Sequence, residues 1–397
     1  MEQLDVQALQ ERGWTPNPFD EFVVKLHSRC NLACDYCYVY EMADQSWMGQ
    51  PKVMQRSTMR ATCARIGEHS RRFRLPAVSV VLHGGEPLLA GQREIEFFLS
   101  ELTRAMPSKT ELVLGIQTNG VLLDENYLQT FDRWGVKVGV SLDGGQTAND
   151  RHRKFRDGRG SYTQVAEGIA RLTQKPYRHL FSGLLCTIDV NNDPVATYEE
   201  LIRFDPPAID FLLPHGNWTQ PPPQLKPGRN LTPYGDWLCM IFDRWIGGDR
   251  REVGVRFFDQ IIDLLLGTEV NSEAIGLAPV RLAVVETDGS LEQVDSLKSA
   301  FDGAADLGLK GPEHSLEEAL WHPAVVARQI GVEALSPTCR QCPIRQVCGG
   351  GHFTHRYREG SGFLNPSAYC LDLKRIIGHI AQRLRDDITR LTQREKR

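Results

Sequence analysis

Apolar runs and helix signals alternate six times between residues 21 and 213, and this alternation constrains the fold more than any other feature. Strands that alternate with helices pair in parallel, so the pattern predicts an α/β fold. Eight repeats would close a full barrel, and six predict a partial (β/α)6 barrel similar to a TIM barrel. The expected strands are Glu21–His27, Val78–Leu82, Leu112–Thr118, Val136–Leu142, Leu180–Ile188 and Ile209–Leu213. Helices are expected near Ser57–Arg71, 92–105, 124–134, from about Tyr162, after Asp193, and near 234–247 and 256–266.

Segments outside that alternation divide the chain into four predicted regions. The proline-rich stretch 218–230 is typical of a linker or loop. The pair Asp288-Gly289 predicts the turn of a hairpin between Arg281–Val285 and Leu291–Val294. The chain ends in a segment whose apolar residues lie on one helical face, from Leu373 to Leu391. We expect an N-terminal extension at 1–20, a barrel at 21–217, a linker with bridging helices at 218–270, and an α+β region at 271–397.

Composition and charge exclude several classes of protein. The 397 residues are 41% hydrophobic and 24% charged, and the net charge of −4 gives no basic field for nucleic acid. No apolar run approaches the roughly 20 residues of a membrane span. The polar, acidic start Met1-Glu2-Gln3-Leu4-Asp5 argues against a signal peptide. We therefore expect a cytoplasmic protein with no nucleic-acid or membrane partner, in which the ten cysteines stay reduced.

Three cysteines, Cys30, Cys34 and Cys37, follow the first predicted strand in a C-x3-C-x2-C spacing. Three thiolates on a tight loop can hold three irons of a [4Fe–4S] cube and leave the fourth iron without a protein ligand. Part of a zinc site is the alternative, although zinc usually takes four ligands from paired C-x2-C knuckles. An iron with an open position can bind and split a chelating cofactor, so the loop predicts chemistry.

A second cysteine group lies near the C-terminus with the spacing Cys339-x2-Cys342-x5-Cys348-x21-Cys370. Four thiolates make a closed site, because every ligand position is supplied by the protein. The ligand count alone fits either a zinc ion or a second iron–sulfur cluster.

The first cysteine spacing, with Tyr36 beside Cys37, resembles the radical S-adenosylmethionine (radical SAM) superfamily. The resemblance implies a [4Fe–4S] cluster that binds SAM at its open iron. The run Gly84-Gly85-Glu86 resembles the motif that holds the methionine amino group, and a Gly-Gly turn is its ordinary alternative. Arg153 matches the arginine that pairs with the methionine carboxylate, which suits a guanidinium fork. Surface exposure is the alternative for Arg153, since other arginines stand nearby.

Two further strand ends carry small polar side chains that can bond the ribose hydroxyls of SAM. These side chains could instead cap the helices that follow. The predicted SAM contacts here are Gln117, Asn119, Ser141 and Asp143.

The second cysteine group resembles the SPASM extension of peptide-modifying radical SAM enzymes, which implies one auxiliary [4Fe–4S] cluster. A full extension has seven cysteines and two auxiliary clusters. In this chain Val294 and His352 stand where two of those cysteines belong, so the first auxiliary cluster is expected to be absent. Asp295 matches the aspartate that takes a proton from the substrate in sulfatase-maturing enzymes, and it is the candidate base. A plain hairpin charge is its alternative.

Longer runs narrow the resemblance to radical SAM/SPASM peptide maturases of the FxsB type. They include the segment from Lys25 to Tyr40, Asp44-Gln45-Ser46-Trp47, Phe181–Cys186 and Phe211–Trp218. The similarity runs from about residue 10 to 385. Such enzymes form cyclophanes in ribosomally made precursor peptides (RiPPs) by joining an aromatic ring carbon to the Cβ of a residue two places on.

The resemblance implies a reaction and its partners. SAM cleavage gives a 5′-deoxyadenosyl radical that takes a hydrogen atom from a peptide Cβ, and the carbon radical attacks the ring. The implied partners are a precursor peptide and an external one-electron reductant of the flavodoxin or ferredoxin type. Two other functions compete: a formylglycine-forming oxidase similar to anaerobic sulfatase maturases, and a non-catalytic, zinc-stabilised binding protein.

Overall fold

One ten-stranded sheet organises the fold of the computed structural model, which describes residues 4–225, 230–248 and 251–395. The strand order is β10-β9-β8-β1-β2-β3-β4-β5-β6-β7. The strands are β1 (Glu21–His27), β2 (Ala77–Gly84), β3 (Glu111–Thr118), β4 (Lys137–Ser141), β5 (Phe181–Thr187), β6 (Ala208–Leu212), β7 (Gly254–Val255), β8 (Leu282–Val285), β9 (Ser290–Glu292) and β10 (Asp306–Lys310).

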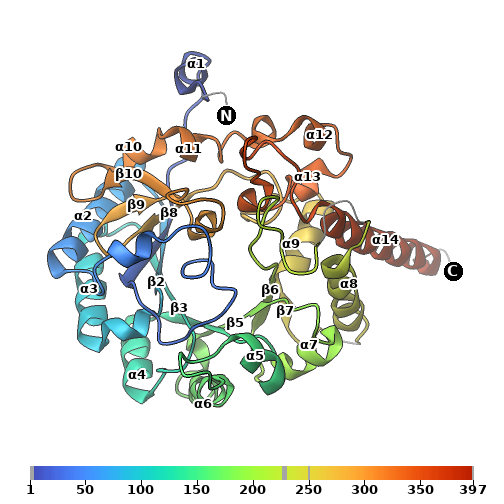
Figure 1. The fold of residues 1–397 in the computed structure, drawn as a ribbon, viewed down its shortest axis with the longest axis horizontal. Coiled ribbons are helices and arrows are strands. Elements are labelled where there is room, and N and C mark those ends of the chain that lie inside the picture. Colours follow the sequence, from blue (N-terminus) through green and yellow to red (C-terminus); the bar gives the residue numbers. More distant parts are fainter. Residues whose placement is uncertain (1–3, 226–229, 249–250, 396–397) are drawn as a thin grey trace.

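The six predicted strand–helix repeats are present, and β1 to β6 pair in parallel in chain order. The α/β fold with a parallel sheet is thereby confirmed. In Figure 1 the strands line the inside of an open barrel and the helices form its outer layer. Phe22, Val24 and Leu26 alternate along β1 with fully buried side chains, as expected for a strand covered by helices.

Side chains that cap the first turn fix where several of the helices begin. Asp124 and Asp193 each accept a hydrogen bond from a backbone N–H in the first turn of the helix that follows. The helices are α1 (Val6–Glu11), α2 (Arg56–Phe73), α3 (Gln92–Ala105), α4 (Glu125–Trp134), α5 (Gln146–His152), α6 (Tyr162–Leu172), α7 (Pro194–Ile202), α8 (Pro233–Ile246), α9 (Arg256–Leu265), α10 (Leu316–Leu320), α11 (Pro323–Val326), α12 (Pro337–Arg340), α13 (Arg345–Cys348) and α14 (Cys370–Glu395).

The C-terminal region shares the barrel's sheet. Strand β8 pairs in parallel with β1, on the edge opposite β2, and the antiparallel strands β9 and β10 extend the sheet from there. The predicted hairpin is present. Its first strand, β8, belongs to the predicted C-terminal region but pairs with β1 of the predicted barrel, so one sheet includes strands of both regions. Of the predicted linker 218–230, residues 226–229 lie outside the described part of the chain.

Helix α14 packs against α8 and α9 through its first half. Leu373, Ile376 and Ile380 are buried, as the apolar pattern predicts. Ile388 and Leu391 belong to the same stripe but are 55% and 61% exposed, because the helix continues past the body of the protein (Figure 1). The helix therefore has the predicted apolar face, but only the first half of that face packs against the rest of the protein.

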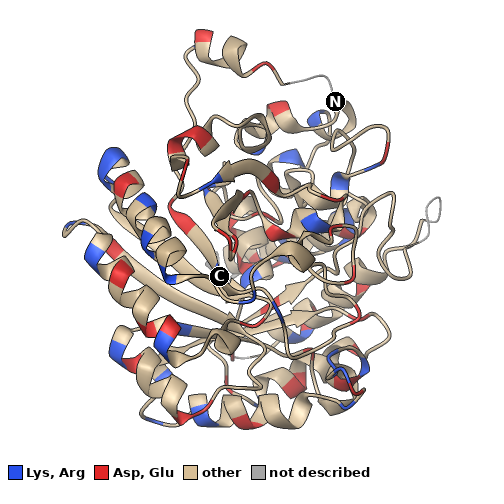
Figure 2. Cartoon of the chain, turned by 60° about the vertical axis from the view of Figure 1, so that its left-hand side comes forward, with Lys and Arg blue, Asp and Glu red and all other residues tan. Residues whose placement is uncertain are grey.

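Charged residues of both signs are interspersed along the outer helices, as the colours of the ribbon in Figure 2 show. Within the described residues, no helix combines the length and the apolar character that a membrane crossing requires.

Candidate active site

The three N-terminal cysteines lie on the loop after β1, at the carboxyl ends of the parallel strands. They line a cavity of about 190 Å³ together with residues from the ends of β2, β3, β4, β5 and β6. A turn in which the Cys37 N–H donates to the Cys34 carbonyl at 3.1 Å brings two of the thiols together. The carboxyl ends of parallel strands are where α/β enzymes place their chemistry.

The thiols of this loop are poorly solvated. Burial raises the pKa of Cys30 to about 12 and that of Cys34 to about 11, and burial also raises the pKa of Cys37. Thiolates are the metal-binding form of cysteine. At neutral pH these three sulfurs therefore need bound cations to become thiolates, which fits a site for an iron–sulfur cluster.

Gly84, the last residue of β2, and Gly85 after it are required by close packing against the end of β1 and the loop that follows β1. A Cβ on Gly85 would overlap the Tyr40 hydroxyl and the Arg29 carbonyl. A Cβ on Gly84, whose φ is +146°, would overlap the His27 carbonyl. Both glycines line the cysteine cavity, so they lie where the SAM resemblance expects them.

The Glu86 carboxylate is buried beneath the cavity and already accepts three hydrogen bonds. Its Oε1 accepts from the Thr118 hydroxyl at 2.7 Å and the Leu88 N–H at 3.1 Å, and its Oε2 accepts from the Asn119 N–H at 2.8 Å. Burial raises its pKa, and these donors partly offset that shift. A carboxylate oxygen can accept two hydrogen bonds, so Oε2 retains room for one further donor.

The polar side chains at the ends of β3 and β4 reach the same cavity. Asn119 donates from Nδ2 to Asn31 Oδ1 at 2.8 Å and lies 3.6 Å from the Cys30 sulfur. Gln117 donates to the Ser141 hydroxyl at 2.9 Å. These three predicted SAM contacts line the cavity beside the cysteines.

Arg153, Tyr36 and Asp143 form a buried chain behind the cysteine loop. Arg153 donates to the Tyr36 hydroxyl at 2.8 Å, and that hydroxyl donates to Asp143 Oδ2 at 2.5 Å. Asp143 also accepts from the Thr187 N–H, and it is absent from the cavity wall that the described residues form. Arg153 does line the cavity, and its buried Nε has no hydrogen-bond partner among the residues that the structure describes. A buried guanidinium with an unpaired donor fits an anionic ligand group such as a carboxylate.

The four C-terminal cysteines converge on a second, small cavity. Cys339, Cys342, Cys348 and Cys370 all line it, from α12, the turn after it, the end of α13 and the start of α14. Burial raises the pKa of Cys348 to about 11 and also raises that of Cys370. Four sulfurs that line one small cavity fit a metal or cluster site, as at the N-terminal loop.

The cysteine loop and the glycine–glutamate turn fall within a known family. Residues 24–202 match the family model described as the Radical SAM superfamily. These residues are a radical SAM domain. The family match and the curated relatives indicate that the chain is an oxidoreductase, which excludes a non-catalytic, zinc-stabilised binding protein.

Curated relatives of the chain include anaerobic sulfatase-maturating enzymes. The serine-type enzyme of Bacteroides thetaiotaomicron is 30% identical over 254 residues, which is 60% of this chain and 58% of that protein. The cysteine-type enzyme of Clostridium perfringens (strain 13 / Type A) is 26% identical over 382 residues, which is 92% of this chain and 97% of that protein.

Solved structures share the fold at low sequence identity. The structure of native anSMEcpe with bound AdoMet superimposes with a TM-score of 0.79 at 22% identity, covering 94% of this chain and 99% of that one. Streptococcus suis SuiB bound to the precursor peptide SuiA gives a TM-score of 0.58 at 12% identity, covering 92% and 78%. These similarities support the arrangement of the barrel and of the C-terminal region.

A radical SAM domain uses a [4Fe–4S] cluster and SAM, and the residues of this cavity fit both. Cys30, Cys34 and Cys37 supply three sulfurs to one space, and Arg153 offers an unpaired donor beside it. Glu86 keeps capacity for an ammonium on the same wall.

Asp295, the predicted base, follows β9 and lies in a buried group of charges inside the barrel. Its carboxylate lies 2.5 Å from the Lys25 ammonium, which also lies 2.5 Å from Glu286. Burial alone would raise the pKa of Asp295, but the ammonium groups of Lys25 and Lys298 lower it below its usual value. Asp295 is absent from the cysteine-cavity wall within the described residues, and its charge reaches the wall residues Tyr38 and His83.

Several residues that lie around the site were not predicted from the sequence. Lys25 is the clearest, because a lysine in the middle of an apolar strand has to find a buried partner. The signal was present in Glu21-Phe22-Val23-Val24-Lys25-Leu26-His27. His215 also lines the cysteine cavity and follows β6, in the run Pro214-His215-Gly216-Asn217. A histidine directly after the last predicted barrel strand was the available signal.

Proposed function

We propose that this enzyme forms carbon–carbon crosslinks in a ribosomally made precursor peptide, closing three-residue cyclophanes of the FxsB type. The bond joins an aromatic ring carbon to the Cβ of a nearby residue. The FxsB-type runs between Lys25 and Trp218 support this reaction. The relation to radical SAM maturases of sulfatases supports a peptide or protein substrate in general.

One structural observation carries the distinction from sulfatase maturation. Val294 stands where a full SPASM region has a cluster ligand, and it is 3% exposed within an apolar cluster that includes Leu297, Ala305 and Phe363. Packed side chains thus occupy that ligand position. His352 replaces the other ligand position and lies against His355 and His215. These two replacements support the expectation of a single auxiliary cluster, with Cys339, Cys342, Cys348 and Cys370 as its proposed ligands.

The residues of the cavity have separate roles in the proposed reaction. When bound at Cys30, Cys34 and Cys37, the cluster and SAM would supply the radical chemistry that removes a hydrogen atom from a peptide Cβ. Arg153 holds the methionine carboxylate, and Glu86 with the Gly84-Gly85 turn holds its ammonium. Gln117, Asn119, Ser141 and Asp143 orient the ribose, the last through Tyr36 and Thr187.

Closing the crosslink removes two hydrogens from the peptide. The Cβ loses one as a hydrogen atom, and the ring loses the other as a proton together with an electron. Asp295 is the proposed proton acceptor. The four C-terminal cysteines would hold an auxiliary cluster, which would supply a site able to take up the electron. We place the reaction in the cytoplasm, where an external flavodoxin or ferredoxin supplies the initiating electron and the cysteines stay reduced.

Formylglycine formation is the second candidate, and the named relatives favour it. Proteins at 30% and 26% identity are serine-type and cysteine-type sulfatase-maturating enzymes. Asp295 occupies the place that the resemblance assigns to their proton acceptor. In that reaction a seryl or cysteinyl Cβ would be oxidised to an aldehyde.

Mass spectrometry of two peptides separates the candidates. The reconstituted enzyme is incubated anaerobically with SAM, a reductant and either a short peptide encoded beside the gene or a sulfatase peptide containing the target serine. Crosslinking and oxidation of serine both remove two hydrogens, so mass alone does not distinguish them. A crosslink gives no backbone fragments between the joined residues and no hydrazide adduct. A hydrazide adduct on the sulfatase peptide, with an unmodified precursor peptide, would replace the proposal by the second candidate.

A further inference from the structure

Another cavity, larger than the cysteine cavity at about 320 Å³, adjoins it at the open side of the barrel. One wall comes from β6 and the start of α9, and the opposite wall comes from the first residues of β1 and β8. Cavities of a few hundred cubic ångströms accommodate small organic groups. Its wall includes Phe211, Phe257, Leu373, His215, His352 and His355.

The two cavities share part of their lining. Leu212, Leu213 and His215, at the end of β6 and just after it, line both. A group seated in the larger cavity therefore lies next to the space beside Cys30, Cys34 and Cys37. Because a substrate has to reach a reactive group generated at those cysteines, the larger cavity is positioned to receive it.

Rings form a continuous wall from one cavity to the other. The ring centroids of Tyr38 and His215 are 4.8 Å apart, those of His215 and His355 are 5.5 Å apart, and those of His352 and His355 are 5.1 Å apart. His355 also lies 4.9 Å from the ring of Tyr369. These separations fall in the range where aromatic rings attract one another in edge-to-face or tilted pairs.

The imidazoles present neutral ring faces at physiological pH. Desolvation lowers the pKa of His215 to about 4 and lowers those of His352 and His355 well below their usual value. His355 and His215 lie in mutual hydrogen-bond contact at 3.3 Å, which holds their rings in place.

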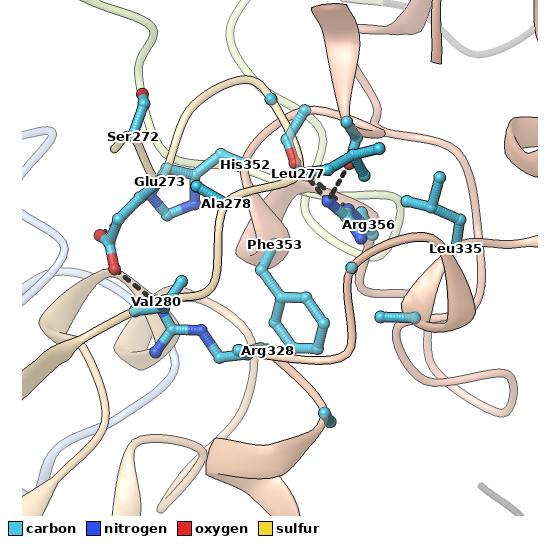
Figure 3. A pocket seen from close by; sticks show the side chains of 16 residues that line it. Ser272, Glu273, Leu277, Ala278, Val280, Arg328, Leu335, His352, Phe353 and Arg356 are labelled. Carbon is cyan, nitrogen blue, oxygen red and sulfur yellow. Dashed lines mark hydrogen bonds and ion pairs between the residues drawn. The ribbon is translucent and has the colours of Figure 1, made fainter. Parts of the chain in front are cut away.

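Most of the charges around the larger cavity are already paired. Arg256 contacts Asp210, and Arg281 lies 3.1 Å from Asp20. Figure 3 shows a neighbouring pocket that His352 also lines, in which Glu273 contacts Arg328. The Glu273 carboxylate lies 3.8 Å from His352 Nε2. Among the described residues of this wall, Glu21 is the remaining acid, and burial raises its pKa.

We propose that this cavity receives an aromatic side chain of the substrate, whose ring packs against the imidazoles of His215, His352 and His355. The inference rests on the proposed function only in assigning that ring to a peptide. It makes the three histidines specificity residues, which contact the substrate beside the site of hydrogen-atom abstraction. The neutral rings favour an aromatic group over an aliphatic one through ring contacts, and the paired charges disfavour an ionic group.

The test compares three small probes on the reconstituted holoenzyme with SAM, under anaerobic conditions. N-acetyl-phenylalaninamide, N-acetyl-leucinamide and N-acetyl-lysinamide are titrated by ligand-observed NMR, and their dissociation constants are compared. We expect the phenylalanine probe to bind at least fivefold more tightly than either of the others. Equal affinities, tighter binding of the lysine probe, or no binding of any probe would overturn the proposal.

Substitutions then locate the preference. His352→Leu removes the ring at similar bulk and is expected to bring the phenylalanine-to-leucine ratio close to one, whereas His352→Phe keeps a ring and keeps the preference. His179→Leu is the matched control, because His179 is an exposed histidine with 56% of its side chain accessible. Iron content and circular dichroism establish that each variant is folded. An unchanged ratio in His352→Leu and likewise in His355→Leu would overturn the proposal.

The aromatic site and the crosslinking function can fail independently of each other. Formylglycine formation with an intact preference for the phenylalanine probe would refute crosslinking and leave the aromatic site standing. Crosslinking without such a preference would do the reverse.

Discussion

The Lys25 ammonium lies 2.5 Å from the Asp295 carboxylate, in the interior of the barrel where their side chains are 3% and 9% exposed. Lys25 and Lys298 share this space with the carboxylates of Glu286, Glu292 and Asp295. Two cations thus hold three anions together behind the cysteine cavity. The predicted base is therefore tied to β1 by a charge pair.

Lys25→Met should destabilise the fold strongly. Removing one partner from a buried pair leaves charge uncompensated, which costs about 3–5 kcal/mol. The measurement is the free energy of unfolding in urea. Lys310→Met is the control, because Lys310 is half exposed beside Asp288 and such a surface pair contributes about 0–1 kcal/mol. If Lys25→Met lowered the free energy of unfolding no more than Lys310→Met does, the buried network would not stabilise the barrel.

Asp295→Asn should separate SAM cleavage from product formation. The amide keeps the size of the side chain but cannot take a proton, so product formation should fall by roughly 10²–10⁴-fold. Formation of 5′-deoxyadenosine with a strong reductant should persist, because Asp295 is absent from the described wall of the cysteine cavity. Deoxyadenosine and modified peptide are measured in the same reaction. Undiminished product formation would remove Asp295 as the base.

Arg153→Gln should weaken SAM binding. A hydrogen bond to a charged group contributes about 1.5–3 kcal/mol, which corresponds to roughly a 10–150-fold rise in the dissociation constant. Equilibrium dialysis of the anaerobic protein measures this constant. Arg159→Gln is the matched control, since its side chain is 70% exposed and pairs with Asp157. If both variants bind SAM as the unmodified protein does, Arg153 does not hold the methionine carboxylate.

His215→Asn should flatten the dependence of stability on pH. Desolvation lowers the pKa of His215 to about 4 from an ordinary 6.5, so between these values the unfolded chain binds a proton that the folded chain does not. Stability therefore falls as pH drops through this window. At pH 5 this group contributes about 2 kcal/mol of that loss, from roughly 1.5 pKa units below 6.5. The free energy of unfolding in urea should differ less between pH 7 and pH 5 in the variant than in the unmodified protein. An equal difference in the two proteins would contradict the lowered pKa of His215.

Cys370→Ser should remove one cluster and leave the other. Two [4Fe–4S] clusters hold about eight irons, so the variant should retain about four. SAM cleavage should persist, because Cys30, Cys34 and Cys37 are untouched. Iron is counted chemically on the anaerobic protein and on a Cys30→Ser control, which should lose SAM cleavage. About four irons and one zinc in the unmodified protein would identify the C-terminal site as a zinc site.

Much of the site could be predicted from local sequence. The three strand ends that carry Glu86, Asn119 and Ser141 meet at one cavity because carboxyl ends of parallel strands share one edge of the sheet. The environment of Asp143 could not be predicted in this way. It lies behind Tyr36, because that hydroxyl and the Thr187 N–H occupy its two oxygens.

The sequence by itself determined the order of strands and helices, the two cysteine sets and the residues at the strand ends. Periodicity, capping and ligand spacing are local properties, and each can be recognised within a few tens of residues of sequence. Only the tertiary structure decided which distant side chains meet. Lys25 meets Glu286 across 261 residues, and His215 meets His355 across 140. Such pairs form because β8 docks beside β1 and the C-terminal region covers the open side of the barrel, and no local pattern encodes that docking.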